Sequence, residues 1–400
     1  MNILVLNAGS SSLKWKLFEM ESSSAIAYGL IEEIAENRSV FHLHYQGRNQ
    51  ETEQVIPDHR AAFSLLFQTL EEEKIIDIDR NLDAIGHRVV HGGEKFFKPT
   101  LIDEMTLGQL KKLNRLAPLH NPANVLGIEL TFGHTPQIPN IAVFDTAFHH
   151  DMPEHAYLYA LPMALYKKFH IRRYGFHGTS HHYVAQEAAK ALNAPLETLN
   201  LITLHLGNGA SACAIKNGKS VDTSMGFTPL EGLIMGSRCG DLDPAIVLYL
   251  IENLHLTAQE TDTLLNTESG LKGICNENDL RTIVQRTKNG DKQAGLALDM
   301  FAYRIKKYIG SYIAVLGRVD AIVFTGGIGE HAALIRSMVL ADLGEAFGIA
   351  LDTDRNTYES HTAHAVHQTD SKIKLYVIPT DEELAIAEEC ANLIYNGKID

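Results

Sequence analysis

The stretch ILVLNAGSSSLKWKLF (Ile3–Phe18) decides the fold. Four apolar residues run into a turn of small and polar residues, and Leu13, Trp15 and Leu17 then alternate with lysines. An apolar run followed by strict alternation predicts two strands joined as a β-hairpin. Backbone N–H groups in such a turn could also approach an anion, to which Lys14 would add a positive charge. From the turn alone, a plain hairpin and a phosphate cradle are equally good interpretations.

The opening stretch has a counterpart in the second half of the chain. Under a shift of 200 residues, LNAGSS (Leu6–Ser11) overlies LGNGAS (Leu206–Ser211). A second pair of similar segments begins at Asp83 and at Asp320, each reading Asp-Ala-Ile and leading into Gly-Gly. Two similarities in the same order predict a duplicated α/β domain, and paired turns could hold a polyphosphate from both sides. The second turn therefore favours phosphate binding for the first.

Composition limits the classes of function. A chain of 400 residues with 45% hydrophobic and 21% charged residues is typical of a globular protein of two domains. The formal net charge of −14 argues against a nucleic-acid or anionic-membrane surface. The four cysteines form no CxxC pair, and no long apolar run or signal-like segment is present. We therefore expect neither disulfides nor a zinc ribbon, and a protein of the reducing cytoplasm.

Apolar strands alternate with capped helices, which predicts an α/β fold. A long helix is expected from about Lys292 to Leu316. Cap residues followed by proline predict helix starts at Asn121 and Asp243, and capping boxes are expected at Thr257 and Thr380, the latter with Glu383. The strands are predicted at Ile3–Leu6, Ala84–Ile85, Ile141–Phe144, Leu201–Leu206, Ala321–Phe324 and Leu375–Ile378.

Several motifs carry candidate chemistry. Arg88 and Arg238 each stand among glycines, where an arginine fork could hold a carboxylate or phosphate, the alternative being a solvated side chain. Asp145 directly follows a buried-looking strand, so it either lines a cleft or caps a turn. His177 and His181 have helical spacing, but a cap at Thr179 or Ser180 would leave only His181 in the helix, so zinc is not expected. The glycines of FTGGIGEH (Phe324–His331) predict a turn before a helix, which could pack against a nucleotide.

Taken together, these motifs resemble the acetate kinase family, also called the acetate and propionate kinase family. The resemblance runs from Asn7 to Glu383 and includes LNAGSSSLK, HRVVHGGE, FDTAFH, YGFHGTSH, HLGNGAS, MGSRCGDLDP, TGGIGE and PTDEEL. It implies a duplicated actin-like (ribonuclease H-like) α/β fold, with an active-site cleft between two domains. The implied domains are residues 1–147 with a C-terminal helix at 384–400, and residues 148–383. The implied partners are ATP or ADP, acetate or acetyl phosphate, Mg²⁺ (or Mn²⁺) and a second copy of the chain.

The resemblance also implies roles for individual residues. Asn7 and Glu382 match metal positions, and Arg88, Asp145, His177 and Arg238 match the catalytic positions. The pocket around the acetate methyl group corresponds to Val90, Leu119, Phe176 and Pro229, with Arg88 on the carboxylate. The nucleotide and its phosphates correspond to Ser10, Ser12, Lys14, His205, Leu206, Gly207, Asn208, Gly209, Asp279, Leu280, Arg281, Gly327, Ile328, Gly329, Glu330 and His331.

The sequence departs from the family pattern at two positions. His331 stands where GIGEN usually has asparagine, and Leu280 is aliphatic where some relatives have Phe or Cys. The expected reaction is direct in-line transfer of the ATP γ-phosphoryl group to acetate, with Asp145 orienting rather than abstracting a proton. The alternatives are a propionate or other short-chain acyl kinase, which Val90 disfavours by crowding the methyl pocket, and an actin- or Hsp70-like ATP-binding module.

Overall fold

The computed structural model describes residues 1–397, which form two compact units. One unit comprises Met1–Ala147 together with the segment from Asp381, and the other comprises Phe148–Thr380. The sequence prediction placed residues 381–383 in the second unit. They lie in the first because helix α17 (Glu382–Tyr395) begins there, and the Asp381 side chain caps it by accepting a hydrogen bond from the Leu384 N–H.

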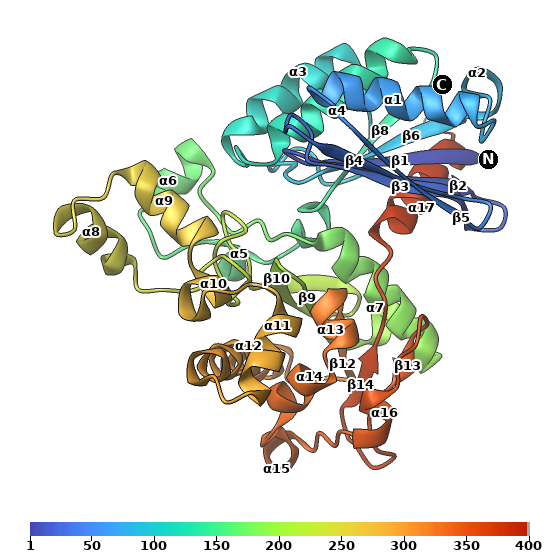
Figure 1. The fold of residues 1–400 in the computed structure, drawn as a ribbon. Coiled ribbons are helices and arrows are strands. Elements are labelled where there is room, and N and C mark those ends of the chain that lie inside the picture. Colours follow the sequence, from blue (N-terminus) through green and yellow to red (C-terminus); the bar gives the residue numbers. More distant parts are fainter. Residues whose placement is uncertain (398–400) are drawn as a thin grey trace. The chain divides into compact units, whose positions relative to one another are not determined.

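The first unit contains an eight-stranded sheet with the order β5-β4-β3-β2-β1-β6-β8-β7 (Figure 1). The predicted hairpin is confirmed, because Leu6 pairs with Trp15 and Asn7 with Lys14 in an antiparallel ladder. Strands β1, β6 and β8 run parallel to one another. The strand bounds are β1 (Asn2–Ala8), β2 (Leu13–Glu19), β3 (Ser24–Glu32), β4 (Ser39–Tyr45), β5 (Arg48–Gln54), β6 (Ala84–Val89), β7 (Thr100–Leu101) and β8 (Asn140–Phe144).

The period-two pattern of the opening stretch builds a core on each face of this sheet. Leu4 and Leu6 pack on one face in a cluster that includes residues of α1, whereas Ile3 and Val5 pack on the other in a cluster that includes residues of α17. The helices of this part of the chain are α1 (His59–Glu72), α2 (Ile78–Asn81), α3 (Glu104–Lys112), η1 (Leu113–Arg115), α4 (Asn121–His134) and α17, with η2 (Ala147–His149) at the boundary of the two units.

The second unit is built on a six-stranded sheet with the order β11-β10-β9-β12-β14-β13. The long helix α12 (Lys292–Leu316) has the predicted bounds. The strands are β9 (Asn200–Leu206), β10 (Ala210–Lys216), β11 (Lys219–Thr223), β12 (Ala321–Thr325), β13 (His364–Ala365) and β14 (Lys374–Val377). The other helices are α5 (Glu154–Tyr157), α6 (Met163–Phe169), α7 (Gly178–Leu192), η3 (Leu196–Thr198), α8 (Pro244–Glu252), α9 (Ala258–Thr267), α10 (Gly270–Cys275), α11 (Leu280–Lys288), α13 (Gly326–His331), α14 (Ala333–Leu340), α15 (Leu343–Phe347) and α16 (Thr353–Thr357).

The predicted duplication is visible in the topology of both sheets. The order β3-β2-β1-β6-β8 in the first matches β11-β10-β9-β12-β14 in the second, with parallel and antiparallel pairs in the same places. The correspondence between the two sheets extends to individual hydrogen bonds. The backbone N–H of Asn2 donates to the Asp83 carboxylate at 2.7 Å, and that of Asn200 to Asp320 at 2.8 Å. Both asparagine amides also donate to a carbonyl two residues before the aspartate.

After the last parallel strand of each sheet, the chain supplies a helix that packs on the other sheet and belongs to that sheet's unit. Helix α17 follows β14 but packs on β1 and β6, and α7 comes after β8 but packs on β9 and β12. The contacts are apolar, with Ile386 and Cys390 in one core cluster and Val184 and Ala188 in the other. Each unit is therefore completed by a segment from the other half of the sequence.

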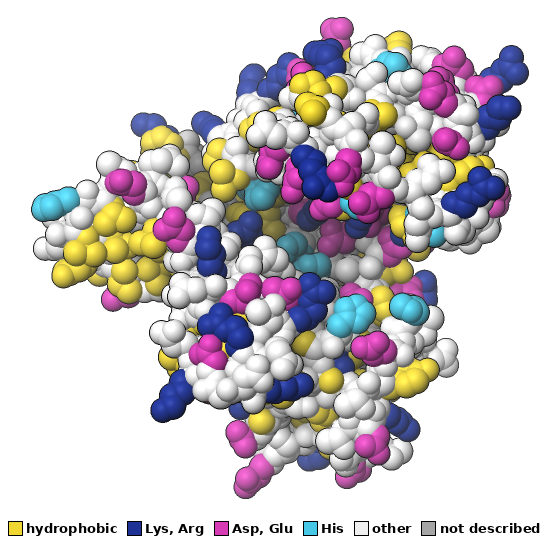
Figure 2. All heavy atoms as spheres, viewed as in Figure 1, with side chains coloured by type: hydrophobic (Ala, Val, Ile, Leu, Met, Phe, Trp, Pro, Cys, Tyr) yellow, Lys and Arg dark blue, Asp and Glu magenta, His cyan; other side chains and the backbone are white. Residues whose placement is uncertain are grey.

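Helix α8 in the second unit presents apolar side chains to solvent. Its sequence is PAIVLYLIE, and each of its residues is at least partly exposed. Figure 2 shows hydrophobic side chains gathered over this helix. The largest exposed apolar side chains on and just beyond α8 are Ile246, Leu248, Tyr249, Ile251 and Leu254.

Two predicted helix starts are confirmed. Asp243 caps α8, and Thr257 and Glu260 form the capping box of α9. The predicted box at Thr380 is wrong, because the Thr380 hydroxyl bonds that of Ser180 at 2.9 Å and Asp381 caps the helix instead.

The remaining start predictions also need correction. Asn121 is the first residue of α4 rather than its cap, since its side chain is held by the backbone of His91. Helix α7 begins at Gly178, so neither Thr179 nor Ser180 caps it. The glycines of FTGGIGEH form the helix α13 itself rather than a turn before it.

Candidate functional site

An arginine and an aspartate meet where two parallel strands of the first unit end. Arg88 lies on β6, and Asp145 directly follows β8, which pairs with β6 in parallel register. The Arg88 Nε lies 3.1 Å from each carboxylate oxygen of Asp145, and Nη2 lies 2.7 Å from Oδ2. The Asp145 side chain is 2% exposed and that of Arg88 20%. Neither the solvated arginine nor the capping aspartate that the sequence left open is therefore correct.

Burial and charge act on this pair in opposite directions. Burial raises the pKa of the Asp145 carboxyl, while the charge and hydrogen bonds of Arg88 act to lower it. The carboxylates of Asp145 and Glu382 raise the pKa of Arg88 against the effect of burial. Because guanidinium is protonated throughout the physiological range and donates along two N–H directions, it holds the Asp145 carboxylate by charge-assisted hydrogen bonds.

The start of α17, with its cap Asp381, adds three carboxylates to this pair, and two lysines of β2 bind two of them. The Oε2 of Glu382 lies 3.5 Å from Nη2 of Arg88. Lys14 pairs with Glu383 and Lys16 with Asp381, each at 2.7 Å. Glu383 is thus an ion-pair partner and not half of a capping box. With Asp145 and Arg88 included, the cluster brings together four carboxylates and three cations.

The cluster suits a hard divalent cation. Asn7 lies on β1 opposite Lys14, and Glu382 begins the helix that packs on β1, so both predicted metal positions belong to the same part of this unit. An amide oxygen and a carboxylate are donors that Mg²⁺ prefers, and Mg²⁺ commonly takes few protein ligands and completes its shell with water and phosphate. Within residues 1–397, no group of three or more His, Cys, Asp and Glu side chains suits a metal ion on its own. The donor set fits an ion that arrives with phosphates.

The hairpin turn at the start of the chain is tight and ordered. The Gly9 N–H donates to the Ser12 carbonyl at 2.8 Å, and Nε2 of His59 contacts the Gly9 carbonyl at 2.7 Å. The counterpart in the second unit is closed similarly, by a 3.0 Å bond from Gly207 N–H to the Gly209 carbonyl. Ser10 is exposed and Ser12 partly exposed, so their hydroxyls are accessible. Phosphate binding by either turn stays a prediction.

In the second unit, His177 lies next to the turn after β9. His177 precedes α7 in a left-handed backbone conformation with φ 56°, and its ring stacks on that of His205 with 4.3 Å between centroids. A Cβ added at Gly209 would lie 3.5 Å from Nε2 of His177 and 3.7 Å from Nη1 of Arg238. The histidine and the arginine therefore approach the same glycine of the predicted phosphate turn.

Arg238 is partly buried and held by backbone. Its Nη1 donates to the Pro229 carbonyl at 3.3 Å, and its own carbonyl accepts from Met235 N–H at 3.1 Å. Burial lowers the pKa of Arg238 below its ordinary value, because it disfavours the charged guanidinium. Arg238 is therefore not a fully solvated surface arginine, which was the alternative left open by the sequence. Pro229, a predicted pocket residue, contacts it directly.

The predicted methyl-pocket residues are divided between the units. Val90 and Leu119 belong to the first, where Val90 is partly buried and Leu119 is 56% exposed. Phe176 and Pro229 belong to the second, where Phe176 is buried. Their meeting around one methyl group stays a prediction.

The sequence reasoning missed two polar residues that hold site segments. The Asn124 side chain accepts from Val90 N–H at 3.0 Å and donates to the Ala8 carbonyl at 2.7 Å, so it ties the Arg88 strand to the opening turn. His149 lies 3.0 Å from the Phe176 carbonyl, beside His177. Both contacts join segments far apart in the chain, so no local pattern could have revealed them.

A pocket of about 850 Å³ in the second unit gathers most of the predicted nucleotide segments. The predicted residues that line it are Gly207, Asn208, Asp279, Leu280, Arg281, Gly327, Ile328 and His331. His205, Leu206, Gly209, Gly329 and Glu330 do not line it. Glu330 instead accepts a 3.3 Å hydrogen bond from Thr380 N–H, and the Gly329 carbonyl accepts from Arg336.

Helix α11 extends this pocket beyond the prediction. Asp279 caps the helix and pairs with Arg281, and Val284, Gln285 and Lys288 line the pocket further along. Residues 281, 284, 285 and 288 share one face at helical spacing, a signal present in the sequence. Apolar Leu280 and Ile328 with polar groups around them give a surface suited to a planar base with a polar edge.

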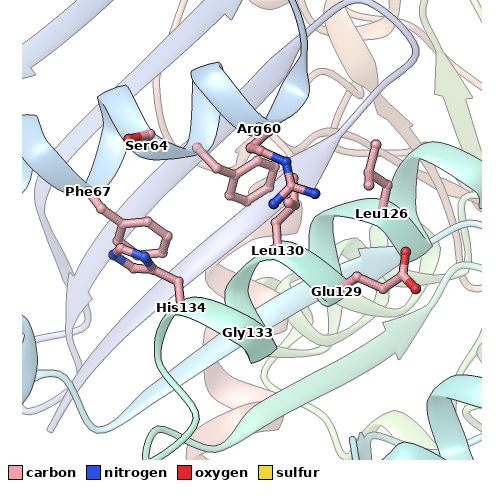
Figure 3. Close-up of a pocket in the computed structure, with 9 residues that line it drawn as sticks. Arg60, Ser64, Phe67, Leu126, Glu129, Leu130, Gly133 and His134 are labelled. Atoms are coloured by element: carbon pink, nitrogen blue, oxygen red, sulfur yellow. The ribbon is translucent and has the colours of Figure 1, made fainter.

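A second hollow in the first unit lies apart from all these residues. It is a groove of about 530 Å³ between α1 and α4, into which Arg60 and Leu130 project, and His134 stacks on Phe67 (Figure 3). No predicted site residue lines it.

The first unit thus holds an arginine–carboxylate cluster. The second unit holds a histidine, an arginine and a nucleotide-sized pocket. Both units share one sheet topology. This combination defines an α/β protein of duplicated design, with an arginine and an aspartate paired at the strand ends of its first unit. Residues 2–388 match the Acetokinase family, and the chain belongs to that family.

Relatives and solved structures agree with this assignment. The acetate kinase of Sulfurovum is 54% identical over 97% of this chain and 98% of its own length, and that of Helicobacter pylori is 54% identical over 97% of each. Among solved structures, the acetate kinase of Porphyromonas gingivalis has a TM-score of 0.93 at 42% identity, covering 98% of this chain and 99% of its own. A propionate kinase from Francisella tularensis has a TM-score of 0.92, also at 42% identity, covering 97% and 98%. The predicted α/β fold is confirmed. Within residues 1–397, no helix has both the length and the apolar character that crossing a bilayer requires.

Proposed function

We propose that this chain is an acetate kinase, which transfers the γ-phosphoryl group of ATP reversibly to acetate and gives acetyl phosphate and ADP. The observation that carries the proposal is the contact of Arg88 with the buried Asp145 at the strand ends. The chain that holds it is 54% identical to the acetate kinases of Sulfurovum and Helicobacter pylori. The proposal requires both units to act on one phosphoryl transfer. The actin- or Hsp70-like alternative needs only the nucleotide segments and leaves this pair without a role.

The acceptor needs no strong base. Acetate is ionised at neutral pH and is therefore already a nucleophile, so the protein has to position it and neutralise charge. Arg88 and Arg238 would hold the acetate and the phosphoryl group in transfer, and His177 would donate a hydrogen bond to an equatorial oxygen. Asp145 is engaged by two N–H groups of Arg88, so its role is to orient that arginine rather than to take a proton.

The nucleotide and its metal extend this arrangement. Leu280 and Ile328 would face the base, with the hairpin turns toward the phosphates. Asn7 and Glu382 would hold Mg²⁺ (Mn²⁺ has the same donor preference), which when bound neutralises phosphate charge. The carboxylate oxygens gathered at the start of α17 support a cation there. We place the reaction in the cytoplasm, which the free thiols of all four cysteines support.

Trapping with hydroxylamine tests the reaction. Acetyl phosphate formed from Mg-ATP and acetate gives acetohydroxamate, and Arg88→Ala should abolish it. Arg60→Ala, in the groove of Figure 3, is the matched control and should retain wild-type yield. A wild-type protein that hydrolyses ATP without giving hydroxamate would contradict the proposal and favour the ATP-binding module.

Propionate is the second candidate acceptor. It is favoured by the propionate kinase from Francisella tularensis, which shares 42% identity with this chain. One extra methylene changes selectivity by only about 1–3 kcal/mol, so both acids should react. Hydroxamate yields at matched subsaturating acetate and propionate measure kcat/KM directly. A higher value for propionate would reassign the substrate, and Val90→Ala should move the ratio toward propionate.

We also propose that the chain forms a homodimer through α8. Exposed Leu248, Tyr249 and Leu254 make an apolar surface of a kind that soluble proteins usually cover. Sedimentation velocity should give a dimer for the wild type and a monomer for Leu248→Lys/Tyr249→Lys. Glu252→Lys, on the same helix, is the control for added charge and should remain dimeric. A wild-type monomer at micromolar concentration would refute this part.

A further inference from the structure

A chain of hydrogen bonds runs through the second unit and ends at His177. The Thr203 hydroxyl lies 2.7 Å from Nδ1 of His181, and Nε2 of His181 lies 2.8 Å from the Ser211 hydroxyl. The Ser211 hydroxyl in turn lies 2.9 Å from Nδ1 of His177. Thr203, His181 and Ser211 are completely buried. No water competes at such positions, so the protons of this chain are arranged by the four side chains themselves.

Proton counting gives the chain a direction. If the Thr203 hydroxyl donates to Nδ1 of His181, then His181 donates from Nε2 to Ser211, and Ser211 donates to Nδ1 of His177. Every proton then has an acceptor. In the reverse direction His181 would donate to Thr203, and the buried Thr203 proton would need another acceptor. Within the described residues Thr203 Oγ1 has no other partner. An unsatisfied buried donor is costly, which favours the first direction.

The charge state of His181 agrees with this count. Burial lowers the pKa of His181 well below its ordinary value, and His149 and His205 act in the same direction. His181 therefore stays neutral, with one ring proton to pass on. A doubly protonated ring would donate to both neighbours and remove the direction.

We infer that Thr203, His181 and Ser211 are positioning residues that hold His177 as the tautomer with its proton on Nε2. This nitrogen approaches the same point above Gly209 as Nη1 of Arg238 does. The tautomer makes His177 a hydrogen-bond donor toward that point, which a phosphoryl oxygen requires, and the opposite tautomer would present a lone pair. The inference rests on the proposed function for its consequence in catalysis, but its statement about the tautomer is independent of the reaction.

Thr203→Val is the sharpest test, because it removes one hydroxyl and keeps the shape. His181 then loses its donor, and His177 should populate both tautomers. Long-range ¹H–¹⁵N spectra of the histidine rings report this directly. We expect kcat to fall about tenfold while the KM values for acetate and ATP stay within about twofold. Thr203→Ser restores the hydroxyl and should restore both tautomer and kcat.

The matched control is Thr223→Val. Thr223 is also buried in this sheet, but its hydroxyl donates to the Ala212 carbonyl and takes no part in the chain. It should change stability without changing the tautomer or kcat. Equal losses of kcat in both variants would reduce the effect to general destabilisation and overturn the inference.

The wild-type spectrum alone can also refute the inference, even if Thr203→Val does not fold. A His177 protonated on Nδ1 in the resting wild-type protein would overturn it. A protein that has the expected tautomer but gives no hydroxamate would support the hydrogen-bond arrangement and contradict the proposed function. Failure of the inference and failure of the proposed function are therefore distinguishable.

Discussion

The guanidinium of Arg88 contacts both carboxylate oxygens of Asp145, at 2.7 to 3.1 Å, from the ends of adjacent parallel strands. The parallel register places Arg88 beside Val143, so the next carboxylate along the chain falls within reach. Because Asp145 is almost completely buried, its carboxylate contacts the arginine rather than solvent.

Asp145→Asn should therefore disable turnover without unfolding the chain. The amide keeps the shape but loses the charge that fixes Arg88, and a hydrogen bond to a charged group is worth about 1.5–3 kcal/mol. We expect kcat to fall about 10- to 150-fold, with a rise in the Mg²⁺ concentration needed for half-maximal rate. Initial rates across a Mg²⁺ titration measure both quantities. A rate within twofold of wild type would remove any catalytic role for Asp145.

Glu382→Gln should weaken Mg²⁺ binding more than Glu383→Gln does. Glu382 lies near Arg88, whereas Glu383 is paired with Lys14. Loss of the negative charge on this carboxylate ligand should raise the half-saturating Mg²⁺ concentration about tenfold. In Glu383→Gln this concentration should hardly change. If the two variants require the same amount of Mg²⁺, the assignment of Glu382 to the metal is wrong.

Gly326→Ala should destabilise the second unit. Gly326 has φ +74°, and an added Cβ would lie 2.7 Å from the Leu206 carbonyl oxygen. A left-handed alanine with this overlap costs about 2–4 kcal/mol. Gly327→Ala is the internal control, because an added Cβ meets nothing within 4 Å there. Urea unfolding followed by circular dichroism compares the two, and equal midpoints would show that the backbone can relax.

The stability of the first unit should fall as the pH drops below 6.5. Burial lowers the pKa of His87 from 6.5 to about 4, and its Nε2 donates to Asn140 at 2.7 Å. The unfolded chain binds this proton between those values and the folded chain does not, so stability decreases as pH falls from about 6.5 to 4, by up to about 1.4 kcal/mol per pH unit.

Replacement of His87 isolates this contribution. His87→Gln should make the pH dependence less steep, and the buried His91, whose pKa is also lowered, accounts for part of the remainder. His134→Gln, at an exposed position of the same unit, should leave the steepness unchanged. Trp15, the only tryptophan, is buried in this unit, so its fluorescence reports the relevant unfolding. An equally steep dependence in His87→Gln would show that other groups cause it.

Local patterns predicted most of the fold. The hairpin at Ile3–Phe18, its repeat at Leu206, and helix 292–316 follow from period and turn chemistry alone. Caps were less certain because neighbouring residues compete. Thr380 and Asp381 are both good caps, and the choice depends on Ser180, which is distant in sequence and bonds Thr380.

The candidate site was predicted unevenly for the same reason. Arg88 was found because it stands among glycines and Asp145 because it follows a recognisable strand, and their contact depends on the parallel pairing of β6 and β8. The series of hydrogen bonds from Thr203 to His177 could not be predicted. It joins β9, β10 and α7 through side chains that belong to no recognisable sequence motif. Pairings of this kind depend on tertiary packing rather than on local propensity.

The placement of α17 has a consequence for how the chain is made. One face of the first sheet, at Ile3, Val5 and Ala84, is covered by three residues of α17: Ile386, Ala387 and Cys390. This face is therefore shielded from water only after the last described helix has formed. During synthesis the amino-terminal half leaves the ribosome with that face open until residues 386–390 have been translated. The second sheet has no such delay, because α7 emerges before β9. The carboxyl-terminal half can therefore complete its core first, against the usual order of emergence.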